Sequence, residues 1–111
     1  MIIRQEGAFA ALTSGFPIDI QLPDDIEAPE NADFLVGVTN IHAQLVRPDG
    51  TPGSSQNLAI PADIIDVRGI VRWRPAGAPM DFTINGTYTI KLTLTFPDGN
   101  LTANGDFKVN D

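Results

Sequence analysis

The fold class is decided by the stretch YTIKLTLTF, which runs from Tyr88 to Phe96. Aromatic or aliphatic side chains occupy every second position, and threonine or lysine stands between them. Successive side chains of a β-strand point to opposite faces, whereas an α-helix would spread these apolar residues around its circumference. The β-branched threonines also favour a strand. The stretch therefore predicts a β-strand with one buried face and one solvated face.

A tight turn follows this strand and predicts a hairpin. The sequence Pro97-Asp98-Gly99-Asn100 has the residues that turns prefer, and alternation returns over 101–103 and 107–109. The pair Asn104-Gly105 separates these two short runs. We therefore expect a terminal hairpin whose second strand is bulged or broken near that pair.

Strand signals also occupy the chain before Tyr88. Ile41, Ala43 and Leu45 alternate inward within 40–47, and the turn sequence PDG at 48–50 ends that run. Trp73 shares a face with Val71, so we expect the indole to lie in the core. A polar, mobile loop is expected over 51–56, and 23–33 has room for one helical turn. Further strands are expected at 17–22, 34–38, 57–60, 63–67 and 69–74.

The spacing of these signals predicts the architecture. About seven to nine short strands with frequent turns indicate an all-β fold, an immunoglobulin-like antiparallel β-sandwich. Nine prolines and ten glycines fit many turns, and 111 residues suit one domain. We assign 16–111 to a single sandwich domain. Residues 1–15 are expected to form an extended N-terminal arm, because Gly7 to Phe16 is small, apolar and uncharged.

Composition narrows the classes of function. The chain has no cysteine, which excludes disulfides and thiolate metal sites. A formal net charge of −7 repels a phosphate backbone, so nucleic acid is not an expected partner. No stretch approaches the ~20 apolar residues of a membrane span, and the first residues do not resemble a signal peptide. We therefore expect a protein made in a cytoplasm, with no membrane partner.

No residue pattern predicts catalysis. The single histidine, His42, lies on the polar side of its expected strand. A catalytic histidine needs a serine or carboxylate at hydrogen-bond distance, and no local motif supplies one, so a surface or interface role is expected. Phosphate loops, nucleophile elbows, zinc-binding helices and dinucleotide fingerprints are missing from the sequence. We expect no catalytic residue, no cofactor and no enzymatic activity.

An acidic stretch occupies 24–33, with five carboxylates. Calcium takes six to eight oxygen ligands, so such a stretch could in principle hold Ca²⁺. The spacing lacks the regular pattern and central glycine of an EF-hand loop. A solvated acidic loop is the simpler interpretation, and calcium binding stays an open alternative.

Three of the seven basic residues lie within 68–74. Their simpler interpretation is that they face solvent and pair across strands with carboxylates. The alternative is a docking patch for an acidic neighbour, because arginine is enriched at protein interfaces. Together with the apolar arm, they give the candidate interface residues Phe9, Leu12, Phe16, Arg68, Arg72 and Arg74.

The second half of the chain shows an ordered set of turn motifs. In sequence order these are LVRPDGT at 45–51, GIVRW at 69–73, NGTYT at 85–89 and LTFPDG at 94–99. This order resembles small immunoglobulin-like domains of tailed bacteriophages, including the N-terminal domain of upper baseplate proteins. In those sequences a strand ending in a PDG turn precedes a G-x-Y strand opening and a second DG hairpin. The resemblance covers residues 41–109.

This resemblance implies a non-catalytic structural protein of a virion, made in the host bacterial cytoplasm. Such a protein docks onto other particle proteins in the tail, baseplate or head–tail region, through strand edges, loops and its arm, and can be a homo-oligomer in the particle. Two alternatives stay open. One is a capsid decoration protein, and the other is a bacterial surface or carbohydrate-binding sandwich module, which would present exposed aromatic residues.

Overall fold

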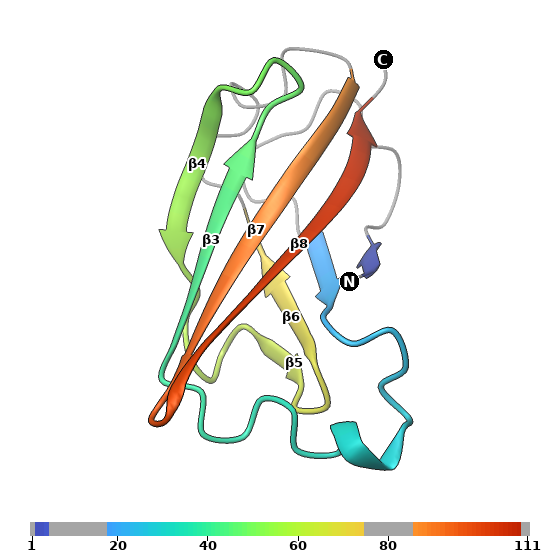
Figure 1. The fold of residues 1–111 in the computed structure, drawn as a ribbon, viewed down its shortest axis with the longest axis vertical. Helices are drawn as coiled ribbons and strands as arrows, with labels where there is room; N and C mark the ends of the chain where they lie inside the picture. The colour runs from blue at the N-terminus through green and yellow to red at the C-terminus, as the bar shows by residue number, and fades with distance from the viewer. Residues whose placement is uncertain (1, 5–17, 75–85, 110–111) are drawn as a thin grey trace.

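The computed structural model describes residues 2–4, 18–74 and 86–109 (Figure 1). Within these ranges the chain is almost entirely β, which confirms the predicted fold class. One 3-10 turn, η1 (Pro29–Asn31), provides the helical turn expected in 23–33. The strands of the described ranges are β1 (Ile2–Arg4), β2 (Ile18–Gln21), β3 (Asn40–Val46), β4 (Pro52–Asn57), β5 (Ile64–Asp66), β6 (Ile70–Trp73), β7 (Gly86–Phe96) and β8 (Gly99–Val109).

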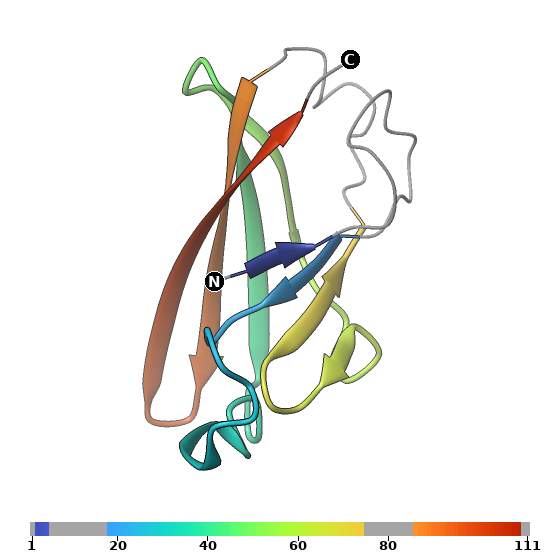
Figure 2. The same cartoon turned by 90° about the vertical axis from the view of Figure 1, so that its right-hand side faces the viewer.

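The strands form two four-stranded antiparallel sheets that face each other (Figure 2). Sheet A has the order β1-β2-β6-β5, and sheet B has the order β4-β3-β7-β8. This is the antiparallel β-sandwich that the sequence predicts. In both sheets the central strands carry the alternating apolar residues, because a central strand is covered by a neighbour on each side and by the other sheet on one face.

The core lies between the two sheets. The inward row of β7 is fully buried through Tyr88, Ile90, Leu92 and Leu94, as the alternation predicts. Trp73 is also fully buried, which confirms its expected core position. Each fully buried side chain of this size stabilises the fold by about 1.5–3 kcal/mol relative to an exposed one. The inward rows of the other central strands contribute Ile18, Ile20, Ile41, Ala43, Leu45 and Val71.

The expected break in the last strand is wrong. Residues 86–96 of β7 pair one to one with residues 99–109 of β8, without a register shift. Asn104 pairs with Lys91, and Gly105 pairs with Ile90. A glycine in a strand costs only about 0.5–1 kcal/mol relative to alanine, so a continuous ladder can accept it.

The polar loop expected over 51–56 is also wrong, because residues 52–56 belong to β4, which lies along the edge of sheet B. Its backbone pairs with β3, and the Gln44 side-chain amide donates to the Gly53 carbonyl oxygen over 3.2 Å. An edge strand needs hydrogen-bond partners on one side only. Its composition can therefore stay polar, and propensity gives little signal for it.

Two expected strands are turns. Segment 34–38 turns across the open end of the sandwich with Leu35 and Val38 buried, and the Leu35 amide donates to the Val67 carbonyl oxygen over 2.9 Å. Segment 57–60 leaves β4 and turns at the cis Ile60–Pro61 peptide. The buried apolar residues of these two segments, Leu35, Val38 and Leu58, join the core cluster from turns instead of from a strand.

The described start of the chain belongs to sheet A. Strand β1 pairs with β2, with Ile2 opposite Gln21 and Arg4 opposite Asp19. Residues 2–4 of the expected arm are therefore a sheet edge. The remainder of that arm, including Phe9 and Leu12, lies outside the described residues, and so does Phe16.

Candidate functional site

Strand β8 is the one long and regular sheet edge in the described ranges. The other edges are blunted: β1 has three residues, β5 has three residues and a register shift, and β4 starts at Pro52 and also shifts register. Short strands, proline and bulges are the usual devices that stop an edge from pairing with another chain. Strand β8 has eleven residues, no proline and no register shift. Among the described strands none pairs with the outer side of β8, although β1 of sheet A lies close to it, so this side offers backbone groups for pairing.

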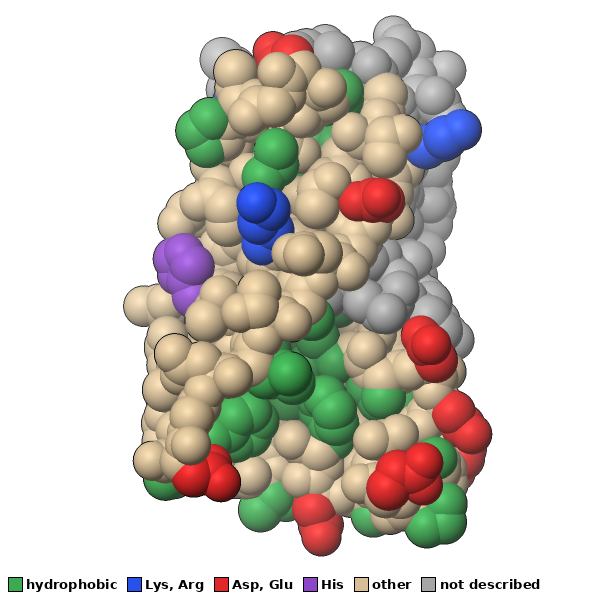
Figure 3. Space-filling view, in the orientation of Figure 1, with side chains coloured by type: hydrophobic (Ala, Val, Ile, Leu, Met, Phe, Trp, Pro, Cys, Tyr) green, Lys and Arg blue, Asp and Glu red, His purple; other side chains and the backbone are tan. Residues whose placement is uncertain are grey.

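The inward row of β8 is covered at one end and open at the other. Phe107 lies opposite Tyr88, stacks on its ring at 5.8 Å between centroids, and is 8% exposed. Leu101 lies opposite Leu94 on the same face, yet Leu101 is 41% exposed while Leu94 is fully buried. An apolar surface thus adjoins the open edge near the hairpin tip. Figure 3 shows hydrophobic side chains gathered in the lower half of the view, with carboxylates around the lower margin of the molecule.

The outward face of sheet B is polar and nearly neutral. Threonine and asparagine dominate its β7 and β8 rows, whose charged residues are Lys91, Asp106 and Lys108. The Thr89 hydroxyl donates to Asp106 Oδ1 over 2.8 Å. Two lysines against one aspartate contrast with a whole-chain charge of −7. A negatively charged partner, including another copy, meets less repulsion on this side of the molecule.

His42 has two side-chain partners that sequence reasoning missed. The register places Asn57 directly opposite His42 and Ser55 two pairs further along β4, opposite Gln44. Asn57 Oδ1 lies 3.0 Å from Nδ1, and Ser55 Oγ lies 3.0 Å from Nε2. Because Asn57 Oδ1 can only accept, Nδ1 carries the proton and Nε2 accepts from the serine hydroxyl. No local motif supplies a partner for the histidine, and its two partners come from the neighbouring strand β4 instead.

The sequence contained a signal for this cluster, but the prediction of a loop over 51–56 hid it. Ser55 and Asn57 are two residues apart, so they share a face of any strand that contains both. Assigning 51–56 to a loop removed that relation. The cluster has the hydrogen-bond order of a nucleophile, a base and a residue that orients the base. His42 is half-buried, and both partners are exposed on the outward face of the sheet.

The three candidate arginines do not form one patch. Arg72 stands opposite Asp19 in the β2–β6 pair, and its Nε and Nη2 donate to the two carboxylate oxygens over 2.7 and 3.0 Å. This is the cross-strand pairing of the simpler interpretation. Arg68 lies in the turn between β5 and β6, and Arg74 is exposed just after β6.

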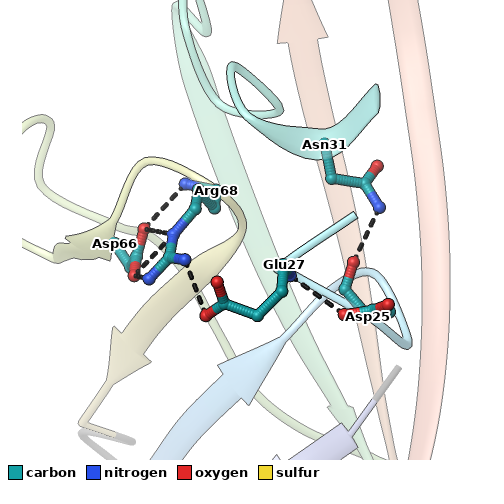
Figure 4. A network of polar contacts seen from close by, with 5 residues as sticks. All are labelled: Asp25, Glu27, Asn31, Asp66 and Arg68. Atoms are coloured by element: carbon teal, nitrogen blue, oxygen red, sulfur yellow. Dashed lines mark hydrogen bonds and ion pairs between the residues drawn. The ribbon is translucent and has the colours of Figure 1, made fainter. Parts of the chain in front are cut away.

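Arg68 joins two segments that are far apart in sequence (Figure 4). Its Nη2 lies 2.7 Å from Asp66 Oδ2, and its Nη1 lies 2.7 Å from Glu27 Oε1. The hydrogen bonds from the Arg68 side chain hold the pKa of Asp66 below its ordinary value of 3.8. The guanidinium is thus already held by two carboxylates, which reduces its availability for an acidic neighbour.

The acidic stretch is held by its own backbone and by Arg68. Asp25 Oδ1 accepts from the Glu27 amide over 3.0 Å, and the Asn31 side-chain amide donates to the Asp25 carbonyl oxygen over 2.9 Å. In the part of the chain that the structure describes, no three histidine, cysteine or acidic residues gather as a metal-binding group.

Comparison with protein-family models, with curated proteins and with solved structures finds no match. None of the described helical residues forms a helix long and apolar enough to cross a membrane. The features that bear on function are therefore the β8 edge, the apolar surface beside it and the polar face of sheet B.

Proposed function

We propose that this chain is a non-catalytic structural protein of a tailed-bacteriophage virion, and that it docks onto other particle proteins in the tail, baseplate or head–tail region. The observation that carries the proposal is the regular eleven-residue edge of β8. A strand from a partner can extend sheet B there, with main-chain hydrogen bonds supplying affinity and side-chain contacts supplying specificity.

Two further features support docking at this edge. Leu101 places an exposed apolar side chain beside it, where an added strand would cover it. The acidic charge of the rest of the chain favours solubility before assembly. The resemblance to phage domains adds the class of partner. Its last motif, LTFPDG, lies at the end of β7 and in the β7–β8 turn, next to the proposed docking edge.

Affinity capture from a lysate of phage-producing cells, with mass spectrometry of the recovered proteins, tests the proposal. We expect the tagged chain to recover capsid, tail or baseplate proteins. Leu101→Asp should reduce that recovery at least ~10-fold, because an unpaired carboxylate would be buried beside the added strand, and ~1.4 kcal/mol already gives a factor of ten. Val36→Asp is the matched control, since Val36 is an exposed aliphatic residue of the 34–38 turn and does not belong to β8.

The competing classes predict different recoveries. A decoration protein would recover capsid proteins alone. A surface-binding module would recover glycans or host surface proteins, and that result would contradict the proposal. The described residues give the glycan alternative little support, because their exposed large hydrophobic side chains, Val36, Ile60, Ile65, Val67 and Leu101, are all aliphatic.

The cluster at His42 has the hydrogen-bond order that ester hydrolysis by Ser55 would use, and an assay separates that function from docking. We expect the purified chain to hydrolyse p-nitrophenyl acetate no faster than its Ser55→Ala variant. The reason is that Asn57 is neutral and cannot stabilise an imidazolium as the carboxylate of a serine-protease triad does. A rate at least ~100-fold above the variant, the usual contribution of a general base, would establish catalysis instead.

A further inference from the structure

We propose that two copies of this chain pair through β8, antiparallel and about a two-fold axis at Asn104, so that their B sheets join into one. This inference rests on the proposed function, because it uses the same edge, and it names the first partner as a second copy. The axis at Asn104 follows from the bounds of β8. Residue 104 is the midpoint of Gly99–Val109, and this placement gives the two strands their greatest overlap.

The pairing resolves the uneven burial of the inward row. Overlap about Asn104 sets Leu101 of one copy opposite Phe107 of the other. Both side chains lie on the inward face, as their partners Leu94 and Tyr88 show. Residues directly opposite in an antiparallel pair have Cβ atoms about 4.5–5.5 Å apart, so the two side chains touch. The exposed Leu101 of each copy is therefore covered by the buried Phe107 of the other.

The charges favour a second copy in this orientation. On the outward side, Asp106 meets Thr102 of the other copy, and Lys108 meets Asn100. No two carboxylates within β8 face each other. The acidic stretch 24–33 and Asp98 lie at the hairpin-tip end of the molecule, where Figures 1 and 3 show the loops and the gathered carboxylates. An antiparallel pair directs these two ends away from each other, which limits repulsion between chains of net charge −7.

Pairing with a second copy also leaves no β8 edge open. An isologous contact engages the same surface on both chains and then stops, whereas a head-to-tail contact through one open edge would continue into a fibre. The other described edges are short or irregular, so the joined sheet would end at β4 of each copy. The edge that is long and keeps its register is thus the one that pairing would remove.

The absence of native cysteine allows a direct test. Single-cysteine variants are purified and exposed to mild oxidation, and the rate of covalent dimer formation is measured. We expect Asn104→Cys to cross-link, because the two Cβ atoms face each other within reach of a disulfide. Ser55→Cys is the control, since Ser55 is also exposed on sheet B but lies on β4. We expect at least ~10-fold slower cross-linking there, because Ser55 lies across β3 and β7 from the β8 edge.

Sedimentation velocity on cysteine-free protein gives the second readout. We expect concentration-dependent dimers for the natural sequence and for Val36→Asp, and a monomer for Leu101→Asp with an unchanged circular dichroism spectrum. A monomer at every concentration, with Asn104→Cys cross-linking no faster than Ser55→Cys, would overturn the pairing. Capture of other particle proteins is a separate measurement, so a monomer that still recovers them through Leu101 would reject self-pairing and leave the docking function standing.

Discussion

Replacing Trp73 by alanine is expected to lower the free energy of unfolding by about 3–5 kcal/mol, the usual effect of removing a buried large aromatic side chain. Trp73 is fully buried on β6 and pairs across the sheet with Ile18. Its removal would leave a cavity between the sheets, lined by strands that are held by ladders on both sides and cannot collapse into it. Urea denaturation monitored by circular dichroism measures the difference.

The phenylalanine variant separates the volume of the indole from its polarity. The Trp73 ring nitrogen is buried and has no hydrogen-bond partner among the described residues. Phenylalanine removes that donor and keeps most of the apolar contact, so Trp73→Phe should lose less than half of what Trp73→Ala loses. If both variants lose the same stability, the indole N–H has a role that its burial does not show.

Substitution of Gly69 by alanine is the second large effect, and we expect a loss of roughly 2–4 kcal/mol. Gly69 has a φ of +131°, which side chains other than glycine rarely adopt, and a Cβ there would lie 2.4 Å from Pro23 Cδ. The position is also fixed from outside, because the Leu22 amide donates to the Gly69 carbonyl oxygen over 2.8 Å. Strain and overlap therefore add at this turn between β5 and β6.

Gly37 provides the matched control. Its φ is +83°, and a Cβ there would meet nothing within 4 Å. Gly37→Ala should therefore show backbone strain alone, about 1–2 kcal/mol. Thermal or urea unfolding of the two variants side by side checks the difference. Equal losses would mean that Pro23 moves aside, and that the contact between the β2–η1 segment and the β5–β6 turn is loose.

The strands that could be predicted from the sequence are those with one buried face and one exposed face. Strands β3 and β7 pack one face on the core and expose the other, so their side chains alternate, and the sequence predicted both. Strand β4 has no such requirement. Its serines and glutamine join sheet B through backbone pairing with β3, which depends on contacts distant in sequence.

The features of the candidate site also fall into those that could be predicted from the sequence and those that could not. The polar face and the exposure of His42 could be predicted from alternation. Its contact with Ser55 and Asn57 could not, because it depends on the register between two strands. The open edge of β8 was also hidden, since Asn104-Gly105 reads as a break in a sequence and only the eleven-pair register shows its continuity. Local propensity cannot supply either result.

That uninterrupted β7–β8 ladder also bears on how the chain reaches its native state. The two strands are joined by Pro97 and Asp98 alone, so every pair forms by extending a contact between near neighbours in the sequence. The Asp19–Arg72 pair of sheet A instead joins residues 53 apart and must close a long loop first. Short-range hairpins form in about 1–10 μs, far faster than sandwiches fold as a whole. The hairpin is therefore the natural template on which β3, and then the opposite sheet, can assemble.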